Sequence, residues 1–275
     1  MLRRYTLLAW TAAAATYLLI VLGAVVRITG SGMGCGDHWP LCNEHLFPPL
    51  DDIGTVIEWS HRLAAALVSA LVAGLAGFAW WLRQRSRKTG HSAPDTVSFG
   101  ALGLLVLQVL LGALTVKLEL PPWTIILHLG TAMVLLAVLL EAARGSVGAQ
   151  HPAPLHLPLL AFVFVTILFG ALTANLGAAA ACTGFPLCNG QLWPSAGGLA
   201  VIQWIHRLLA YTLVVYVAVW AVRSKRRGAW GVGVLVLIQV ALGAATVLLG
   251  LPPALQAAHV AVGAAVWAGV VLASR

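Results

Sequence analysis

Long runs of apolar residues make up most of the chain, and short polar segments separate them. Eight of these runs are long enough to cross the roughly 30 Å hydrocarbon layer of a membrane as α-helices. We expect the helices at residues 5–28, 58–82, 96–117, 123–143, 156–176, 201–222, 228–248 and 254–273. The pattern therefore predicts an all-α membrane protein with eight transmembrane helices.

The composition agrees with this fold class. Of the 275 residues, 60% are hydrophobic and 9% are charged, whereas a soluble domain carries about 25% charged residues. The net charge of +8 does not indicate nucleic-acid binding, because the basic residues gather in alternate gaps between apolar runs. This positive-inside pattern predicts a cell-membrane protein with both termini cytoplasmic and lipid as a partner. The external gaps are then 29–57, 118–122, 177–200 and 249–253.

The second half of the chain repeats the first. Residues 108–128 match residues 239–259, with 12 of 21 positions identical, and His61-Arg62 matches His206-Arg207. Each repeat holds four helices, an even number, so the two copies should have the same orientation in the membrane. We expect two parallel-repeat four-helix bundles, with domains at 1–148 and 149–275.

Apart from His156 at the edge of a predicted helix, four of the nine histidines lie in the predicted helices: His61, His128, His206 and His259. Each lies within about two turns of the external start of an even-numbered helix, so all four should lie at a similar depth. Two imidazoles of one bundle can then ligate the two faces of one haem, and we pair His61 with His128 and His206 with His259. The alternatives are polar residues that hold helices together and, with fewer ligands than it needs, a zinc ion.

An arginine follows the first histidine of each repeat, at Arg62 and Arg207. The planar guanidinium of an arginine suits a haem propionate, which predicts a second contact to each haem. The alternative is a long side chain that extends to the lipid headgroups.

Only the first repeat carries a carboxylate three residues before its histidine. Glu58 occupies this position in the first repeat and Gln203 occupies it in the second. A helix N-terminus favours an acidic residue for electrostatic reasons alone. Against that alternative, a carboxylate beside a macrocycle can accept a proton or stabilise positive charge. We therefore expect the reaction site in the first bundle and a permanently bound haem in the second.

All four cysteines lie in the predicted external gaps, as Cys35 with Cys42 and Cys182 with Cys188. Their short spacing on the oxidising side of a membrane predicts one disulfide within each loop. The alternative is four inert, small apolar side chains.

The motifs together resemble the haem A synthase family of membrane enzymes. The residues that carry the resemblance are Arg27–Cys35 (RITGSGMGC), Trp39–Cys42 (WPLC), Glu58–Arg62 (EWSHR), Leu111–Val116 (LGALTV), His128, Cys182, Pro186–Cys188, His206-Arg207 and His259. They span nearly the whole chain and are specific as a set.

The resemblance implies oxidation of the C8 methyl group of haem O to a formyl group, giving haem A for terminal oxidases. It implies that His61 and His128 hold the substrate haem, that His206 and His259 hold haem b, and that Glu58 is catalytic. The pair Cys35 and Cys42 would serve redox transfer or haem delivery. Haem O synthase, a quinone or other electron acceptor, and oxidase assembly factors are the partners that it suggests.

Two other functions fit parts of the pattern. A di-haem b-type membrane cytochrome that exchanges electrons with quinone would use the same four histidines, but it gives no reason for Glu58 in one bundle only. A transporter would need polar residues at the middle of the membrane, and the stretches 64–77 and 208–220 offer almost none.

Overall fold

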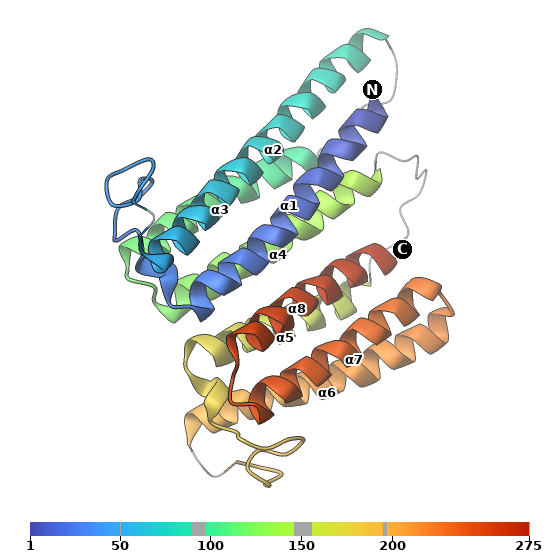
Figure 1. The fold of residues 1–275 in the computed structure, drawn as a ribbon. Helices are drawn as coiled ribbons and strands as arrows, with labels where there is room; N and C mark the ends of the chain where they lie inside the picture. Colours follow the sequence, from blue (N-terminus) through green and yellow to red (C-terminus); the bar gives the residue numbers. More distant parts are fainter. Residues whose placement is uncertain (50, 90–96, 146–155, 195–196, 275) are drawn as a thin grey trace. The chain divides into compact units, whose positions relative to one another are not determined.

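The computed structural model describes residues 1–49, 51–89, 97–145, 156–194 and 197–274. Within these residues the chain forms long α-helices and two short 3₁₀ helices, with no β-strand (Figure 1). The long helices are α1 (Leu2–Ile28), α2 (Ile53–Thr89), α3 (Val97–Lys117), α4 (Pro122–Gly145), α5 (Leu157–Asn175), α6 (Gly198–Ser224), α7 (Arg227–Leu248) and α8 (Pro253–Ala273). The short ones are η1 (Ser31–Met33) and η2 (Ala178–Ala180). The all-α prediction is confirmed.

The eight long helices are all long and apolar enough to cross a membrane. The shortest, α5, has 19 residues and would extend about 28 Å along its axis. Many of their large apolar side chains are exposed, as an outer surface in contact with lipid requires; Leu7 and Leu67, for example, are 68% and 59% exposed. These observations support a multi-pass membrane protein, while the cytoplasmic location of both termini stays a prediction.

Helix α2 is longer than its apolar run predicts. It begins at Ile53 instead of residue 58, because the Asp52 carboxylate caps it and accepts the backbone N–H of Thr55 at 2.7 Å. At its other end it continues to Thr89, and the guanidinium of Arg83 lies 5.8 Å from the centre of the Phe99 ring. Capping by Asp52 therefore accounts for the earlier start of α2, and a cation–π contact accompanies the helix where it passes the end of its apolar run.

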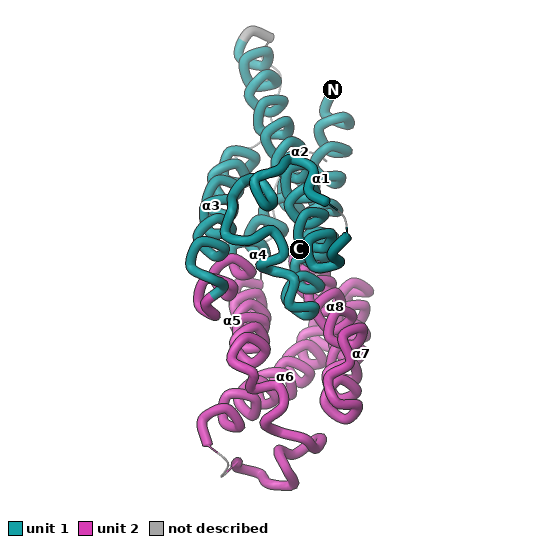
Figure 2. The backbone as a smooth tube through the Cα atoms, turned by 60° about the vertical axis from the view of Figure 1, so that its left-hand side comes forward, with its two compact units in different colours: residues 1–120, 131–152 teal, residues 121–130, 153–275 magenta. Residues whose placement is uncertain are grey.

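The chain divides into two compact units (Figure 2). Unit 1 comprises residues 1–120 and 131–152, and unit 2 comprises residues 121–130 and 153–275. The first turns of α4, with His128, therefore belong to unit 2, although the sequence assigns them to the first bundle. The expected boundary between residues 148 and 149 lies outside the described residues.

Each unit has its own helix contacts. In unit 1, α2 packs against α1 and α3, and η1 lies against α1 and α2. In unit 2, α6 packs between α5 and α7, and α8 packs against both α7 and α5. The four helices α5 to α8 thus form a closed ring of contacts. Cofactor sites of helix bundles are built from side chains on such facing helices.

Candidate functional site

Two histidines of unit 2 are each seated against a glycine of a neighbouring helix. A Cβ atom on Gly170 of α5 would stand 2.9 Å from Cε1 of His206 on α6. A Cβ atom on Gly243 of α7 would stand 3.0 Å from Cε1 of His259 on α8. Because both distances are shorter than an ordinary van der Waals contact, each glycine leaves room for an imidazole between two helices.

A glutamine of α7 contacts the second of these histidines. Nε2 of Gln239 lies 3.2 Å from Nε2 of His259, within hydrogen-bonding distance. The amide is packed between α7 and α8, since a Cβ atom on Gly263 would stand 3.1 Å from the same amide nitrogen. Sequence reasoning assigned no role to Gln239. The repeat could have pointed to this residue, because Gln239 aligns with Gln108 and each is a polar residue in an otherwise apolar helix.

The first histidine of unit 1 has the same kind of seat. A Cβ atom on Gly23 of α1 would stand 3.1 Å from Cε1 of His61 on α2. The predicted partner of His61 is His128, which lies in the part of α4 that belongs to unit 2. The pairing of His61 with His128 therefore stays a prediction, based on the repeat.

The histidine seats fit a haem. The buried Nδ1 atoms of His61, His206 and His259 have no hydrogen-bond partner among the described residues. A buried polar atom without a partner is costly, so a bound ligand or water is the expected remedy. The described part of the chain has no group of three or more His, Cys, Asp or Glu side chains able to hold a metal ion. Two histidines on different helices are enough for the axial ligands of an iron porphyrin, whereas a structural zinc ion needs four ligands.

Both predicted disulfides are present. Cys35 is bonded to Cys42, and Cys182 is bonded to Cys188. We call the segments that they close the first disulfide loop (residues 35–42) and the second disulfide loop (residues 182–188). All four cysteine side chains are buried, so each bond lies on the inner side of its loop.

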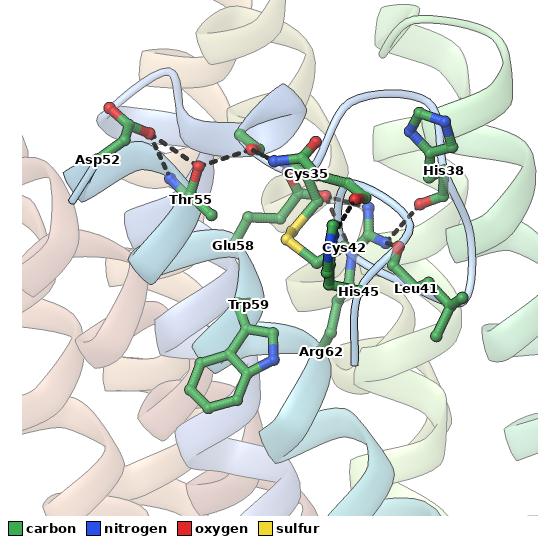
Figure 3. The surroundings of a disulfide bond; sticks show 12 residues. Cys35, His38, Leu41, Cys42, His45, Asp52, Thr55, Glu58, Trp59 and Arg62 are labelled. Atoms are coloured by element: carbon green, nitrogen blue, oxygen red, sulfur yellow. Dashed lines mark hydrogen bonds and ion pairs between the residues drawn. A yellow bond between two sulfur atoms is a disulfide. The ribbon is translucent and has the colours of Figure 1, made fainter. Parts of the chain in front are cut away.

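Glu58 and Arg62 fasten the first disulfide loop to α2 (Figure 3). Glu58 is buried, and its Oε2 accepts the backbone N–H of Cys35 at 2.7 Å. Its Oε1 accepts both Nε and Nη2 of Arg62, the former at 3.1 Å. Nη1 of Arg62 donates to the carbonyls of His38 and Leu41, each at 2.6 Å. A buried carboxylate is thus held in a fixed orientation one turn before His61.

Gln203 and Arg207 fasten the second disulfide loop to α6 in the same way. Gln203 is buried, and its Oε1 accepts the backbone N–H of Cys182 at 2.6 Å. Nη1 of Arg207 donates to the carbonyls of Gly184 at 2.6 Å and Leu187 at 2.8 Å. Its Nη2 donates to the carbonyl of Cys182 at 2.9 Å, where Arg62 instead contacts a carboxylate. Sequence reasoning assigned both arginines to propionates and missed these contacts to loop carbonyls.

A second carboxylate holds the start of α2. Oδ2 of Asp52 accepts the N–H of Thr55 at 2.7 Å and its hydroxyl at 3.0 Å, while that hydroxyl also lies 2.8 Å from the carbonyl of Gly34 (Figure 3). The backbone hydrogen bond from Thr55, followed by the side-chain one, lowers the pKa of the Asp52 carboxyl. The N-terminus of α2 is thus also bonded to Gly34, the residue directly before the first disulfide loop.

Comparison with known proteins gives one consistent result. Residues 6–55 and 50–271 match the family described as cytochrome oxidase assembly protein, COX15-CtaA. The chain is similar to the haem A synthase of Symbiobacterium thermophilum, with 36% identity over 84% of this chain and 81% of the relative. It is similar to those of Halalkalibacterium halodurans (34% identity, 85% and 83% covered) and Alkalihalophilus pseudofirmus (33%, 76% and 73%).

Proposed function

The chain belongs to the COX15-CtaA family of cytochrome oxidase assembly proteins, and from this membership we infer that it is a haem-dependent membrane oxidoreductase that makes haem A. The observation that carries the inference is the match to haem A synthases over most of the chain and most of each relative. The eight apolar helices agree with a farnesylated, membrane-soluble substrate. A di-haem b-type cytochrome that exchanges electrons with quinone is not favoured by this membership.

We propose that unit 2 holds haem b between His206 and His259. The support is the pair of glycine seats, together with the packing of α5, α6, α7 and α8 in one ring of contacts. A haem bound there would supply one-electron redox chemistry. By the repeat, we propose that His61 and His128 hold haem O, with Gly23 giving His61 the same kind of seat.

We propose that Glu58 is the catalytic carboxylate. The reaction converts the C8 methyl of haem O to a formyl group by two two-electron oxidations through an alcohol. With water as the source of the formyl oxygen, the two steps together would release four protons and pass four electrons to the acceptor. The Glu58 carboxylate would accept such a proton or stabilise positive charge on the substituent, since the hydrogen bonds from Cys35 and Arg62 still leave lone pairs on its oxygens. What supports this role is Gln203, which binds the equivalent loop without a charge.

Arg62 and Arg207 would act near the haems mainly by holding the disulfide loops. Their Nη1 atoms are occupied by loop carbonyls, so a propionate contact would use their remaining donors. A quinone is our candidate for the electron acceptor. Haem O synthase would supply the substrate, and oxidase assembly factors would receive the product.

The test is conversion of haem O in cells. The chain is co-expressed with a source of haem O, and the haems are extracted from membranes and separated by chromatography. We expect haem A in these membranes and none in membranes from cells that carry the empty vector. Haem b alone, with haem O unconverted, would contradict the proposal and favour the plain cytochrome.

A further inference from the structure

Each disulfide loop is followed by an exposed apolar segment. In unit 1 this segment is Leu46-Phe47, the first tip, and in unit 2 it is Leu192-Trp193, the second tip; each is followed by a buried proline, Pro48 or Pro194. The two tips occupy equivalent positions of the repeat, 146 residues apart. Leu46 and Phe47 are 69% and 75% exposed, and Leu192 and Trp193 are 78% and 65% exposed. Exposure of a large apolar pair in both copies indicates a surface that is normally covered.

The first tip is held in place against α2. The backbones of Cys42 and His45 exchange hydrogen bonds of 3.0 and 2.9 Å, which turns the chain toward the tip. Nε1 of Trp59 then donates to the carbonyl of Leu46 at 3.0 Å. The ring of Phe47 packs against the ring of Trp59, with 6.0 Å between their centres. The exposed side chains thus lie at a defined place beside the first turns of α2.

That place is the end of a lipid-facing stripe. Trp59 lies on the same face of α2 as Leu63 and Leu67, which follow it at intervals of four residues. Leu63 and Leu67 are 56% and 59% exposed on a helix long and apolar enough to span a membrane. In a membrane, an exposed apolar stripe of this kind would contact lipid chains. The first tip lies beside Trp59, at the N-terminal end of the stripe.

We propose that both tips insert into the interfacial layer of the bilayer, on the side of the membrane where the disulfide loops lie. Aromatic and aliphatic side chains at the level of the headgroups favour this layer. The neighbouring carboxylates Glu44 and Asp51 flank the first tip and would remain in water. The first disulfide loop is then held from one side by Glu58 and Arg62 and from the other by lipid. The proposal does not depend on the reaction that the protein performs.

The test uses nitroxide labels in lipid nanodiscs. All four native cysteines are in disulfides, so a single introduced cysteine is the only thiol that reacts with the label. The labelled variants are Phe47→Cys and Leu192→Cys at the tips, with Glu44→Cys and Asp51→Cys as matched controls. A count of one label per chain verifies that no native disulfide has rearranged. For each nitroxide, the rate of collision with oxygen, which is more soluble in lipid, is compared with the rate of collision with a water-soluble nickel complex.

We expect labels at 47 and 192 to show a several-fold higher ratio of oxygen to nickel collisions than labels at 44 and 51. Tip labels with the same ratio as the controls would overturn the proposal, because the tips would then lie in water. Tip labels shielded from both agents would also overturn it, because a protein surface would cover the tips instead of lipid. Variants that lose haem A formation but keep the lipid signature would leave the proposal intact.

Discussion

In unit 1 the backbone N–H of Cys35 donates to a carboxylate, Glu58, whereas in unit 2 the equivalent N–H of Cys182 donates to an amide, Gln203. An amide therefore suffices to fasten a disulfide loop to its helix. Arg207, which holds the second disulfide loop, has no acidic partner among the described residues; its Nη2 donates to the backbone carbonyl of Cys182 instead. The negative charge of Glu58 is thus not needed to bind the loop N–H, although in unit 1 it also pairs with the guanidinium of Arg62. This difference between the units is what our proposal of a catalytic Glu58 would explain.

Among the changes that test the difference between the two units, removal of a proposed axial histidine should have the largest effect. In the His206→Ala variant we expect complete loss of haem b, because by our proposal His206 is one of its two iron ligands. In His61→Ala we expect haem b to remain while haem A formation is lost. The measurement is the absorption spectrum of purified protein together with extracted haems. Equal loss of haem b in both variants would contradict the division of roles between the units.

The glycine seats allow a finer separation of the two units. Gly170→Ala places a Cβ atom 2.9 Å from Cε1 of His206, and Gly23→Ala places one 3.1 Å from Cε1 of His61. Each imidazole must turn or move, so we expect a partial loss of haem b in the first variant and slower haem A formation with normal haem b in the second.

The matched control for these variants is Gly231→Ala, since a Cβ atom there meets nothing within 4 Å. Gly231 lies in α7, where replacing glycine by alanine should leave the stability of the protein unchanged or raise it by up to about 1 kcal/mol. Paramagnetic resonance of the oxidised haem and the haem content per chain are the measurements. A spectrum of Gly170→Ala identical to that of the control would show that the seat does not orient His206.

A smaller difference concerns the second disulfide loop, which has one extra attachment. The hydroxyl of Tyr211 donates to the carbonyl of Pro186 at 2.7 Å, whereas the repeat places Ala66 at the equivalent position of unit 1. We expect Tyr211→Phe to lower the free energy of unfolding of unit 2 by about 1 kcal/mol. Chemical unfolding in mixed micelles measures this loss. Tyr216→Phe is the control, and an equal loss in both variants would count against the hydrogen bond.

The smallest difference depends on pH. The hydrogen bonds from Thr55 lower the pKa of Asp52, so its contribution to stability is present above the ordinary value of 3.8 and is lost as the pH falls through the lowered pKa. The corresponding helix start in unit 2 has Gly197 as its N-cap, without a side-chain hydrogen bond. Hydrogen exchange should therefore accelerate at the start of α2 over this acid range and not at the start of α6. Asp52→Asn should abolish the difference, and a persistent one would point to another group.

Hydrophobicity predicted the membrane helices well because an apolar run sets the length of a span. The ends of α2 were missed, since both lie beyond that run, and the start depends on the Asp52 cap. The disulfides were predicted because cysteines six or seven residues apart in a loop leave few other partners.

The contacts of Arg62 could not be predicted, because they depend on the path of a loop more than 20 residues away along the chain. The glycine seats were present in the sequence, and Gly243 even aligns with Gly112 in the repeat. Glycine is common in membrane helices, however, so its presence alone did not mark a histidine seat. Gln239 was missed for a similar reason, since one amide in an apolar helix does not reveal which side chain it contacts.

The exchange of Glu58 and Gln203 tests the central claim most directly. Haem A formation is measured by chromatography of extracted haems in Glu58→Gln and in the control Gln203→Glu. In the first variant we expect the rate to fall by about 10²- to 10⁴-fold with haem b and folding retained, and in the control we expect it to be nearly unchanged. Normal haem A formation in Glu58→Gln would show that the carboxylate serves only to hold the first disulfide loop.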